Sequence, residues 1–558
     1  MEKSLFSDKR LYISIATILI AAFLLFFNLG KYALWDDEAD TALFAQSVWS
    51  TGDTYAMLDH NLIAHTSGQE LRGFYNRYIP PLGFYIAAPF VGLNPGSVFA
   101  ARFPFALLGL LTITLILLFL YKSGSSHTTW LLTCAGILCN VSFMLFFRQC
   151  RYYAPAIFFS TFIVYLYVHR NNQKIAYILS SILLFLLLCS HYLAYFALLG
   201  GLFVDYFVFE RKKRPLTFSQ SSIVFFPQLI LGGLLLSIYN LSFINNSFDY
   251  TFGSWIIYKA TIAFWNLRDL NNCEIGSILL IILAPFLYYR KKNINLVRCP
   301  LAILVYIIVT SVFSPIPIFG NGSSRIFTVH GFAEIRYIAP LIPLCIFIAV
   351  ITIETLAGSK KLIILLLAIL TFSTNILNKA LMLKTYNNAK WGSPIAKTPI
   401  RSTILEFVKE LTSMNKSTYR TTADWINTNV KNKETIWVEP GFASYPLMYH
   451  APKALYAWQL KEKIPQNANL PDIHFVGKIS PDYIIAFGPF RKDVGEKMEE
   501  LAMQGDLYEK IEQIDLYWYD LIRPELFWHS FRNITNFNLE EEAVYIYKKL
   551  KIPERHSS

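Results

Sequence analysis

The chain has 558 residues, of which 54% are hydrophobic, 16% are aromatic and only 16% are charged, and its net charge is +12. Soluble globular proteins carry about 25% charged residues, and the mean hydropathy of this chain is positive at +0.39. The composition excludes a disordered, collagen-like or ordinary cytosolic protein, and it predicts a chain that crosses a membrane many times.

The composition changes near residue 384. Residues 1–383 contain 27 Lys and Arg against 16 Asp and Glu, whereas residues 384–558 contain 23 against 22. The positive charge therefore belongs to the apolar part, and we expect a transmembrane domain over 1–383 and a second domain over 384–558. All seven Cys lie in the first part, mostly in apolar runs that favour small buried hydrophobes, and no CxxC or Cys/His spacing suggests a metal site.

Eleven apolar stretches come close to the roughly 20 residues that a membrane-spanning helix needs. They are 11–29, 98–120, 130–147, 153–168, 175–189, 192–209, 222–243, 276–289, 299–318, 338–357 and 361–383. The first follows Lys9 and Arg10 and lacks a small-residue cleavage site, so we expect a retained anchor. The run 175–209 is divided into two short helices that turn near Ser190 and His191.

The orientation of the spans follows from Lys and Arg in the short loops. With a cytosolic N-terminus, 16 basic residues fall in inner segments, while the outer loops before residue 384 hold 11 basic and 11 acidic residues. This asymmetry explains the positive charge without a nucleic-acid partner. The odd number of spans then places residues 384–558 outside the cytosol. We therefore expect a multi-pass protein of the plasma membrane whose C-terminal domain is extracytoplasmic.

Three outer segments are long, namely 30–97, 244–275 and 319–337. The first is rich in Trp, Tyr, Pro and acids, and its apolar stretches 41–49 and 82–90 are too short to cross a bilayer. Such stretches favour helices that lie at the membrane interface.

The C-terminal part mixes helix and strand patterns. Residues 422–426 predict the start of a helix with Thr422 or Asp424 near its cap. Alternating apolar residues over 434–439, 482–487 and 514–519 predict strands. The expected fold is an α-helical polytopic membrane protein with a C-terminal extracytoplasmic α/β domain.

Four acids lie within five residues just beyond the first span, at Asp36, Asp37, Glu38 and Asp40. They repel one another unless they are hydrated, share protons or face cations. A solvated interfacial loop is the alternative interpretation. A functional interpretation is favoured by the basic residues that we expect on the same membrane face. They are Arg72, Arg77, Arg148, Arg151, His191, Arg325, His330 and Arg336. Arginine binds phosphate bidentately and a carboxylate serves as a base toward a hydroxyl, so the pattern fits transfer from a lipid phosphate.

The order of the motifs resembles that of a known family. The motifs are Asp37-Glu38, Pro80-Pro81-Leu82-Gly83-Phe84-Tyr85, Ala101-Arg102-Phe103-Pro104, Arg148-Gln149-Cys150-Arg151-Tyr152-Tyr153-Ala154, Ser190-His191-Tyr192 and Glu334-Ile335-Arg336-Tyr337-Ile338-Ala339-Pro340. In this order, and with shared sidedness, the chain resembles the GT-C membrane glycosyltransferases, in the branch that holds protein O-mannosyltransferases and the lipid A aminoarabinose transferase. The resemblance covers most of residues 1–383 and only the layout of the rest.

The resemblance implies an inverting transfer of a monosaccharide from a polyprenyl-phosphate donor to an acceptor on the outer membrane face. It makes Asp37 the candidate base and Glu38 its catalytic neighbour, which positions the acceptor or a cation. The candidate ligands of the donor phosphate are Arg336, Arg151, Arg148 and Arg77. His191, Tyr192, Tyr152 and Tyr337 are the candidate residues of the substrate pocket.

The same resemblance implies that no cofactor is required, because arginines offset the charge of a lipid-phosphate leaving group in the role that a metal plays for nucleotide sugars. A divalent cation on Asp37 and Glu38 is the alternative, since some GT-C enzymes use one. The expected partners are the polyprenyl-phosphate-linked sugar, a protein, lipid or glycan acceptor, and the bilayer.

Two positions depart from the family pattern. Some relatives have Lys directly before Pro-Pro-Leu, where this chain has Ile79, which leaves Arg77 or Tyr78 as the nearest substitutes. Some relatives also have Asp before the Pro that opens the fourth span, where this chain has Ala154. We therefore do not transfer from these relatives to this chain a reaction scheme with two carboxylates. We also do not transfer the identity of the donor sugar, hexosyl or pentosyl.

Two other classes of protein fit parts of the sequence. The first is a transporter or flippase of lipid-linked sugars, but such proteins place ionisable groups near the bilayer midplane and show repeated halves. This chain has no evident repeat, and Asp205 and Glu354 lie near inner span ends. The second is a membrane scaffold, for which eleven spans are more than anchoring needs. We expect the C-terminal domain to cover the outer cavity and to help select the acceptor, with Tyr517–Tyr519 and Trp528 as sugar contacts or core residues.

Overall fold

The computed structural model of the chain describes residues 9–64, 68, 71–170, 173–239, 252–273, 275–314, 335–380, 400–414, 416–463, 467, 469–516 and 543–550. Contacts divide the described residues into two compact units. Unit 1 comprises residues 9–27 and 105–412, and unit 2 comprises residues 28–104, 413–516 and 543–550. The segment 30–97 therefore groups with the C-terminal part of the chain, so the units differ from the two sequence-based domains that meet at residues 383 and 384.

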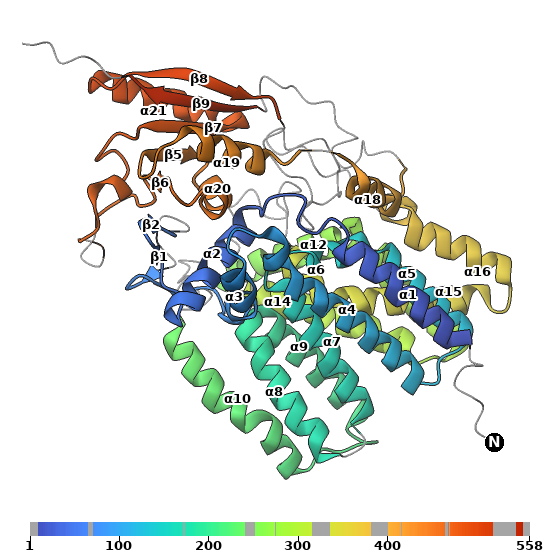
Figure 1. The fold of residues 1–558 in the computed structure, drawn as a ribbon. Coiled ribbons are helices and arrows are strands. Elements are labelled where there is room, and N and C mark those ends of the chain that lie inside the picture. The colour runs from blue at the N-terminus through green and yellow to red at the C-terminus, as the bar shows by residue number, and fades with distance from the viewer. Residues whose placement is uncertain are drawn as a thin grey trace, which may run out of the picture. The chain divides into compact units, whose positions relative to one another are not determined.

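Unit 1 is built from helices (Figure 1). They are α1 (Lys9–Phe26), most of α4 (Val98–Lys122), α5 (His127–Cys139), α6 (Val141–Phe147), α7 (Tyr153–His169), α8 (Lys174–Ser190), α9 (Tyr192–Asp205) with the π-helical η3 (Tyr206–Glu210), α10 (Phe218–Ile238), α12 (Phe252–Cys273), α13 (Ser277–Lys291), α14 (Asn295–Phe313), the 3-10 helix η5 (Ile335–Leu341), α15 (Ile342–Ala357), α16 (Lys361–Ala368) with the π-helical η6 (Ile369–Ser373), α17 (Ile376–Ala380) and α18 (Thr403–Thr412). Helix α9 packs on α14, α8 packs on α7 and α10, and α15 packs on α5.

Among the described residues, six helices are long and apolar enough to cross a membrane, and seven if α5 and α6 form one span bent by 62°. Helices α7 and α8 are shorter apolar helices. Each of the eleven predicted stretches overlaps a helix, whereas the number of spans stays a prediction. The division of residues 175–209 is confirmed, because α8 ends at Ser190 and α9 begins at Tyr192.

Helix α12 lies in the segment 244–275, which the sequence analysis predicts to be an outer loop. Polar side chains on α12 bond to the end of α14: Lys259 Nζ donates to the Ser314 carbonyl at 2.8 Å and Asn266 Nδ2 donates to Ser311 Oγ at 2.9 Å. A search for apolar runs misses such a helix because part of its packed face is polar.

In unit 2, helix α2 (Asp36–Thr51) packs on α3 (Leu82–Leu93), with the rings of Phe44 and Phe84 5.5 Å apart. Gly52 ends α2 with a φ of 83°, a left-handed conformation that glycine adopts without strain. Between the two helices lie two small hairpins, β1 (Met57–Leu58) with β2 (Asn61–Leu62) and β3 (Leu71–Arg72) with β4 (Tyr75–Asn76). Helices over 41–49 and 82–90 are thus confirmed, and their place at the interface stays a prediction.

The C-terminal part of unit 2 has a five-stranded sheet in the order β6-β5-β7-β9-β8. The strands are β5 (Thr435–Glu439), β6 (Leu455–Tyr456), β7 (Tyr483–Phe487), β8 (Tyr508–Ile514) and β9 (Val544–Lys549). Strand β5 runs parallel to β6 and β7, whereas β9 is antiparallel to β7 and β8. All residues of β7 are buried, as expected for a central apolar strand. Strand β8 is a mostly exposed edge with Lys and Glu.

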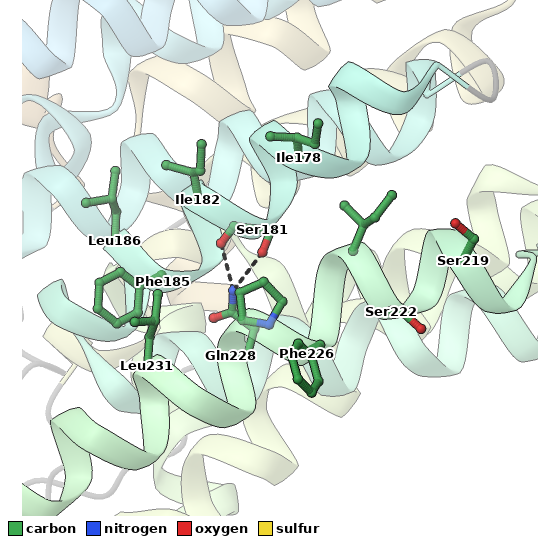
Figure 2. Close-up of a pocket in the computed structure, with 12 residues that line it drawn as sticks. Ile178, Ser181, Ile182, Phe185, Leu186, Ser219, Ser222, Phe226, Gln228 and Leu231 are labelled. Atoms are coloured by element: carbon green, nitrogen blue, oxygen red, sulfur yellow. Dashed lines mark hydrogen bonds between the residues drawn. The ribbon is translucent and has the colours of Figure 1, made fainter.

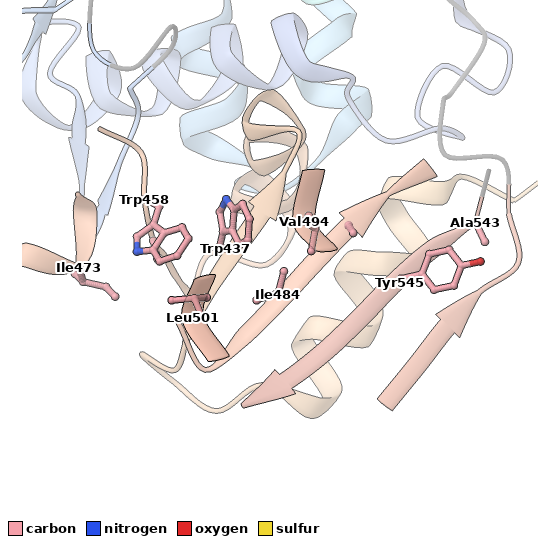
Figure 3. Packing of buried hydrophobic residues seen from close by; sticks show 10 residues of the cluster. Trp437, Trp458, Ile473, Ile484, Val494, Leu501, Ala543 and Tyr545 are labelled. Carbon is pink, nitrogen blue, oxygen red and sulfur yellow. The ribbon is translucent and has the colours of Figure 1, made fainter. Parts of the chain in front are cut away.

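Three longer helices accompany the sheet, namely α19 (Thr418–Asn429), α20 (Ser444–His450) and α21 (Arg491–Met503). Trp437 of β5 and Trp458 lie 4.8 Å apart between ring centroids. Ile484, Val494 and Leu501 pack into the same buried cluster (Figure 3). An α/β fold for this part is therefore observed.

Two details of the sequence prediction are wrong here. The helix begins at Thr418 rather than near Thr422, because Ser417 Oγ accepts a hydrogen bond from the Arg420 amide at 3.4 Å and thereby caps the first turn. The Thr422 hydroxyl lies inside the helix and donates to the Thr418 carbonyl at 2.9 Å. The strand predicted over 514–519 ends at Ile514, so only its first residue is in β8. Tyr517–Tyr519 and Trp528 lie outside the described residues. The strands predicted over 434–439 and 482–487 are confirmed.

Hydrogen bonds join segment 30–97 to the C-terminal part within unit 2. Asn61 Nδ2 donates to the carbonyls of Pro452 and Ala454 at 3.0 Å each, and Asn61 Oδ1 accepts from the Tyr456 amide at 2.9 Å. The Tyr449 hydroxyl donates to the Ser97 carbonyl at 3.1 Å. Helix α2 also packs on α20, so the four acids Asp36, Asp37, Glu38 and Asp40, which we call the acidic motif, lie at the start of a helix that contacts the α/β fold.

Candidate active site

The acidic motif forms the first turns of α2. Trp35 precedes the helix in an extended conformation, and Asp36, Asp37 and Glu38 occupy its first turn. Carboxylates at this end of a helix are stabilised by the helix dipole and by the unpaired amides of the first turn. Glu38 completes the local structure, because the Trp35 amide donates to its Oε2 at 3.4 Å. The concentration of acids thus has a local structural basis, and a solvated loop is excluded for this segment.

Glu38 forms a buried ion pair with Arg102 of α4, within unit 2. Arg102 Nε donates to Glu38 Oε1 at 2.8 Å, and Arg102 Nη2 donates to Oε2 at 2.5 Å. The same guanidinium donates to the carbonyls of Leu29, Tyr32 and Ala33 at 3.0 to 3.1 Å. Glu38 is 0% exposed and Arg102 is 9% exposed. This pair fixes the chain that leads into α2, so Glu38 has a structural role that the sequence analysis did not assign to it.

Asp37 differs from Glu38 in its exposure. The Asp37 residue is 8% exposed, and its backbone carbonyl accepts from the Thr41 hydroxyl at 2.9 Å inside the helix. A general base must contact the group whose proton it takes. Both adjacent acids are buried, and Asp37 is the less buried of the two.

Arg77, a predicted phosphate ligand, is engaged by Asp53. Arg77 Nη1 donates to Asp53 Oδ1 at 2.9 Å and Nη2 donates to Oδ2 at 2.6 Å. The bound guanidinium lowers the pKa of the Asp53 carboxyl. The Arg77 guanidinium also lies over the Tyr75 ring, 4.9 Å from its centroid. These contacts account for the position of Arg77 without a phosphate.

Arg148, in unit 1, holds the end of α1. Its Nη1 donates to the carbonyls of Leu24, Leu25 and Phe27 at 2.9 to 3.0 Å. The last carbonyls of a helix lack partners within it, and a cation there complements the helix dipole. Arg148 is 6% exposed, so it is a buried residue whose contacts cap the end of α1.

The other predicted residues of unit 1 form one cluster with Tyr153, and we call it the tyrosine–arginine cluster. It comprises Arg151, Tyr152, Tyr153, His191, Tyr192, Arg336 and Tyr337. Arg151 lies over the ring of Tyr152 at 5.0 Å, and Arg336 lies over the ring of Tyr337 at 5.4 Å. His191 connects the two pairs, with centroid distances of 4.9 Å to Tyr152 and 5.5 Å to Tyr337. The structure thus brings together, from three distant segments, two predicted phosphate ligands and the four predicted residues of the substrate pocket.

His191 occupies a defined position in this cluster. Its Nδ1 accepts a hydrogen bond from the Ala194 amide at 3.0 Å and caps α9. An accepting Nδ1 belongs to the neutral imidazole that carries its proton on Nε2. The ring is 7% exposed and stacks against Tyr192 at 6.1 Å. A helix cap explains why a His lies at this turn, and the ring remains one wall of the cluster.

Two residues of these sites were not predicted in their roles. Tyr153 belongs to the cluster, because its hydroxyl accepts from Arg336 Nη1 at 3.5 Å and its ring lies 4.6 Å from that of Tyr152. Arg102 was noted only as part of a motif. A charged residue near the start of a long apolar helix was the available signal, since such a residue needs a buried partner.

No group of three or more His, Cys, Asp or Glu residues suited to hold a metal ion occurs in the part of the chain that the structure describes. Glu439 is a further unusual acid, at the carboxyl end of β5. Burial and the neighbouring charge of Asp493 raise the pKa of Glu439 to about 7. It lies in the α/β fold and not in the acidic motif.

No protein-family model matches the chain, and no curated protein sequence matches it. The fold is similar to two crystal structures of ArnT, the lipid A aminoarabinose transferase, from Cupriavidus metallidurans, one bound to undecaprenyl phosphate and one in the apo state. Each has a TM-score of 0.54 and 11% sequence identity, and covers 96% of this chain and 97% of that chain. An Archaeoglobus fulgidus oligosaccharyltransferase gives a TM-score of 0.42 and 10% identity, covering 87% of this chain and 70% of that chain. The expected resemblance to the branch that holds the aminoarabinose transferase is confirmed for the fold.

Proposed function

We propose that the chain is an inverting glycosyltransferase that moves a monosaccharide from a polyprenyl-phosphate donor to an acceptor on the outer face of the membrane. The observation that carries the proposal is the similarity of fold, over 96% of the chain, to ArnT in its complex with undecaprenyl phosphate. The acidic motif and the tyrosine–arginine cluster supply the types of residue that this reaction needs.

The proposed reaction is a single displacement. Asp37 takes the proton of the acceptor hydroxyl, and the acceptor oxygen attacks the anomeric carbon of the sugar. The bond between that carbon and the phosphate oxygen breaks, its electron pair stays on the phosphate, and polyprenyl phosphate leaves. One displacement inverts the anomeric configuration. A carboxylate base of this kind contributes roughly 10²- to 10⁴-fold to a rate.

Arg151 and Arg336 are the proposed ligands of the donor phosphate. Arg151 lies over the Tyr152 ring and Arg336 lies over the Tyr337 ring, and a guanidinium has N–H donors whose spacing suits bidentate binding of phosphate. As negative charge grows on the leaving phosphate, fixed positive groups stabilise it more strongly than in the ground state. Tyr152, Tyr337, His191 and Tyr192 are the proposed walls for the sugar phosphate.

Glu38 is proposed as a positioning residue. Its ion pair with Arg102 holds the start of α2, and the orientation of Asp37 depends on that start. This assignment needs one carboxylate in the chemistry, in agreement with Ala154 at the place where some relatives have a second acid. Divalent-ion binding is not needed for this scheme.

The proposal is tested by incubating the purified chain with a panel of radiolabelled polyprenyl-phosphate sugars and measuring release of polyprenyl phosphate. Release with one donor, dependent on Asp37, supports the proposal and identifies the sugar. A transporter of lipid-linked sugars would move the intact donor across a vesicle membrane without release. Translocation of uncleaved donor with no release from any member of the panel would refute the transferase.

A further inference from the structure

Helices α8 and α10 enclose an apolar groove in unit 1. The groove has a volume of about 580 Å³, within the range of roughly 300–1,000 Å³ that is usual for ligand sites. Its walls include Ile178, Ile182 and Leu186 from α8, and Ile223, Phe226 and Leu231 from α10 (Figure 2). These positions recur every three to five residues, so each wall is a single face of its helix.

The two helices approach each other closely near their middles and in their second halves. A Cβ at Gly232 would lie 3.3 Å from Leu188 Cδ2, so a glycine allows close approach there. In the middle, Gln228 Nε2 donates to the Ser181 carbonyl at 2.7 Å and Ser181 Oγ donates to the Val224 carbonyl at 3.2 Å. Nearer the start of α10, the lining residues Ser219 and Ser222 are too short to fill the space.

Helix α10 carries many exposed apolar side chains besides those of the groove. Leu229 is 75% exposed, Leu234 is 58% exposed and Ile230 is 55% exposed. The helix qualifies as a membrane span of 21 residues, with only 11% of its most apolar window buried. A groove in this helix is therefore open to lipid, and hydrocarbon rather than water is the medium that fills it.

The end of the groove where both helices begin is strongly basic. Arg211, Lys212, Lys213 and Arg214 lie three residues before the start of α10, and all four are exposed. Lys174 opens α8 one helical turn before Ile178. The Arg214 guanidinium donates to the Val168 carbonyl at 3.1 Å, which ties the basic segment to the end of α7.

Nearby acids do not neutralise this basic segment. Arg298 pairs with Asp205 through Nε and Nη2 and with Glu210 at 3.0 Å. Within the described residues, no carboxylate forms an ion pair with Arg211, Lys212, Lys213 or Arg214. A cluster of basic residues at the end of a membrane helix attracts anionic lipid, by about fivefold in affinity for each Lys or Arg.

We propose that this groove binds an anionic phospholipid, with one acyl chain between α8 and α10 and the headgroup phosphate on the basic segment Arg211–Arg214. The lipid comes from the leaflet on the basic side of the protein, which the positive-inside rule makes the cytosolic one. The site requires neither the transferase activity nor its donor, and its occupant is a bilayer lipid rather than a substrate. The bound lipid fills the space between the N-terminal halves of α8 and α10 and so holds these two helices together.

Native mass spectrometry of the full-length chain tests the proposal with two lipids of identical acyl chains, phosphatidylglycerol and phosphatidylcholine. Lys212→Gln with Lys213→Gln removes two charges from the mouth of the groove, and Lys291→Gln with Lys292→Gln removes two charges from the basic end of α13 as a matched control. Ser222→Trp fills the groove, and Leu229→Trp places the same side chain on an exposed position of α10 outside it.

The wild-type chain is expected to retain phosphatidylglycerol at least tenfold more strongly than phosphatidylcholine. The 212/213 variant should lose most of this preference, on the order of tenfold, and Ser222→Trp should bind neither lipid at this site, while both controls behave as wild type. Equal retention of the two lipids by the wild type, or equal losses in the 291/292 control, would overturn the proposal.

A second experiment uses only the wild-type protein, so its result does not depend on whether the variants fold. Phosphatidylglycerol with a photoreactive group on its acyl chain is expected to label the peptides that contain Ile178–Leu186 and Ser219–Leu231. Labelling elsewhere would contradict the site. Displacement of the label by an equimolar amount of polyprenyl monophosphate would also contradict it, because the groove would then belong to the tail of the donor.

Discussion

Two arginines of unit 2 and two arginines of unit 1 differ in the main contacts of their guanidinium groups. In unit 2, Arg102 and Arg77 each hold a carboxylate with two in-plane hydrogen bonds, to Glu38 and Asp53. In unit 1, Arg151 and Arg336 lie over tyrosine rings. The first pair holds carboxylates through its N–H donors, with Arg77 also over the Tyr75 ring, whereas the second pair lies over tyrosine rings and Arg336 donates to the Tyr153 hydroxyl. Residues that the sequence places on one membrane face therefore separate into structural pairs and candidate ligands of a phosphate.

The two adjacent acids at the start of α2 provide the strongest test of this comparison. Asp37→Asn is expected to lower the turnover number by roughly 10²- to 10⁴-fold, because an amide cannot accept the acceptor's proton. Donor binding and the melting temperature should change little. Turnover and donor binding are measured on the same purified protein, and substantial remaining turnover would remove Asp37 as the base.

Breaking the buried pair should act on stability instead. Glu38→Leu leaves the Arg102 charge buried without its carboxylate, and loss of one partner of a buried pair costs about 3–5 kcal/mol. The change in the free energy of unfolding is measured by denaturant titration in detergent. The double variant Glu38→Leu with Arg102→Met should recover part of the loss.

Recovery stays incomplete because Arg102 also holds three backbone carbonyls. A single Glu38→Leu variant with wild-type stability would contradict the structural role of the pair. If that variant instead lost turnover at unchanged stability, Glu38 would belong to the chemistry.

Donor binding should separate the two kinds of arginine. Arg336→Ala is expected to weaken donor binding by about 1.5–3 kcal/mol, which corresponds to roughly 10- to 100-fold in KM, through loss of a charge-assisted hydrogen bond. Arg77→Ala is the matched control and should leave KM for the donor unchanged, since Arg77 is paired with Asp53. Similar increases in KM for both variants would remove the distinction between them.

The smallest expected effect concerns the pH dependence of stability. The pKa of Glu439 is raised from 4.5 to about 7 by burial and by Asp493. The folded state therefore favours the protonated acid, and its contribution to stability is lost as pH rises from about 4.5 to about 7. Solvent screening limits the loss to about 1–2 kcal/mol.

Unfolding free energies at several pH values check this prediction. Glu439→Gln should flatten the dependence between pH 4.5 and 7, and Glu434→Gln, at a half-buried position just before β5, should not. A wild-type protein that gains stability over this interval relative to the Glu439→Gln variant would contradict the assignment.

The sequence predicts most of the helices and two strands, because long apolar runs and alternation are local signals. It fails where the decisive contact is distant or polar. Helix α12 packs through Lys259 and Asn266, and the true start of α19 depends on Ser417, a single capping side chain. Neither feature changes the hydropathy pattern on which the prediction rests.

The candidate site shows the same limit. The order of the motifs selects Asp37, Arg151, His191 and Arg336 as candidates, since each lies at a helix end expected on one membrane face, and their roles stay predictions. It could not distinguish arginines that bind carboxylates or carbonyls of the chain from those that contact rings. Arg148 and Arg77 were assigned to the phosphate for their charge, and their contacts with α1 carbonyls and Asp53 are set by the tertiary fold.

The anomeric configuration of the product tests the proposed reaction most directly. A donor labelled with ¹³C at the anomeric carbon is incubated with purified protein and acceptor, and the configuration of the glycoside is determined by nuclear magnetic resonance. A single displacement with Asp37 as base predicts a product whose configuration is opposite to that of the donor. A product with the donor's configuration would require a covalent intermediate or a front-side attack, and would contradict this account.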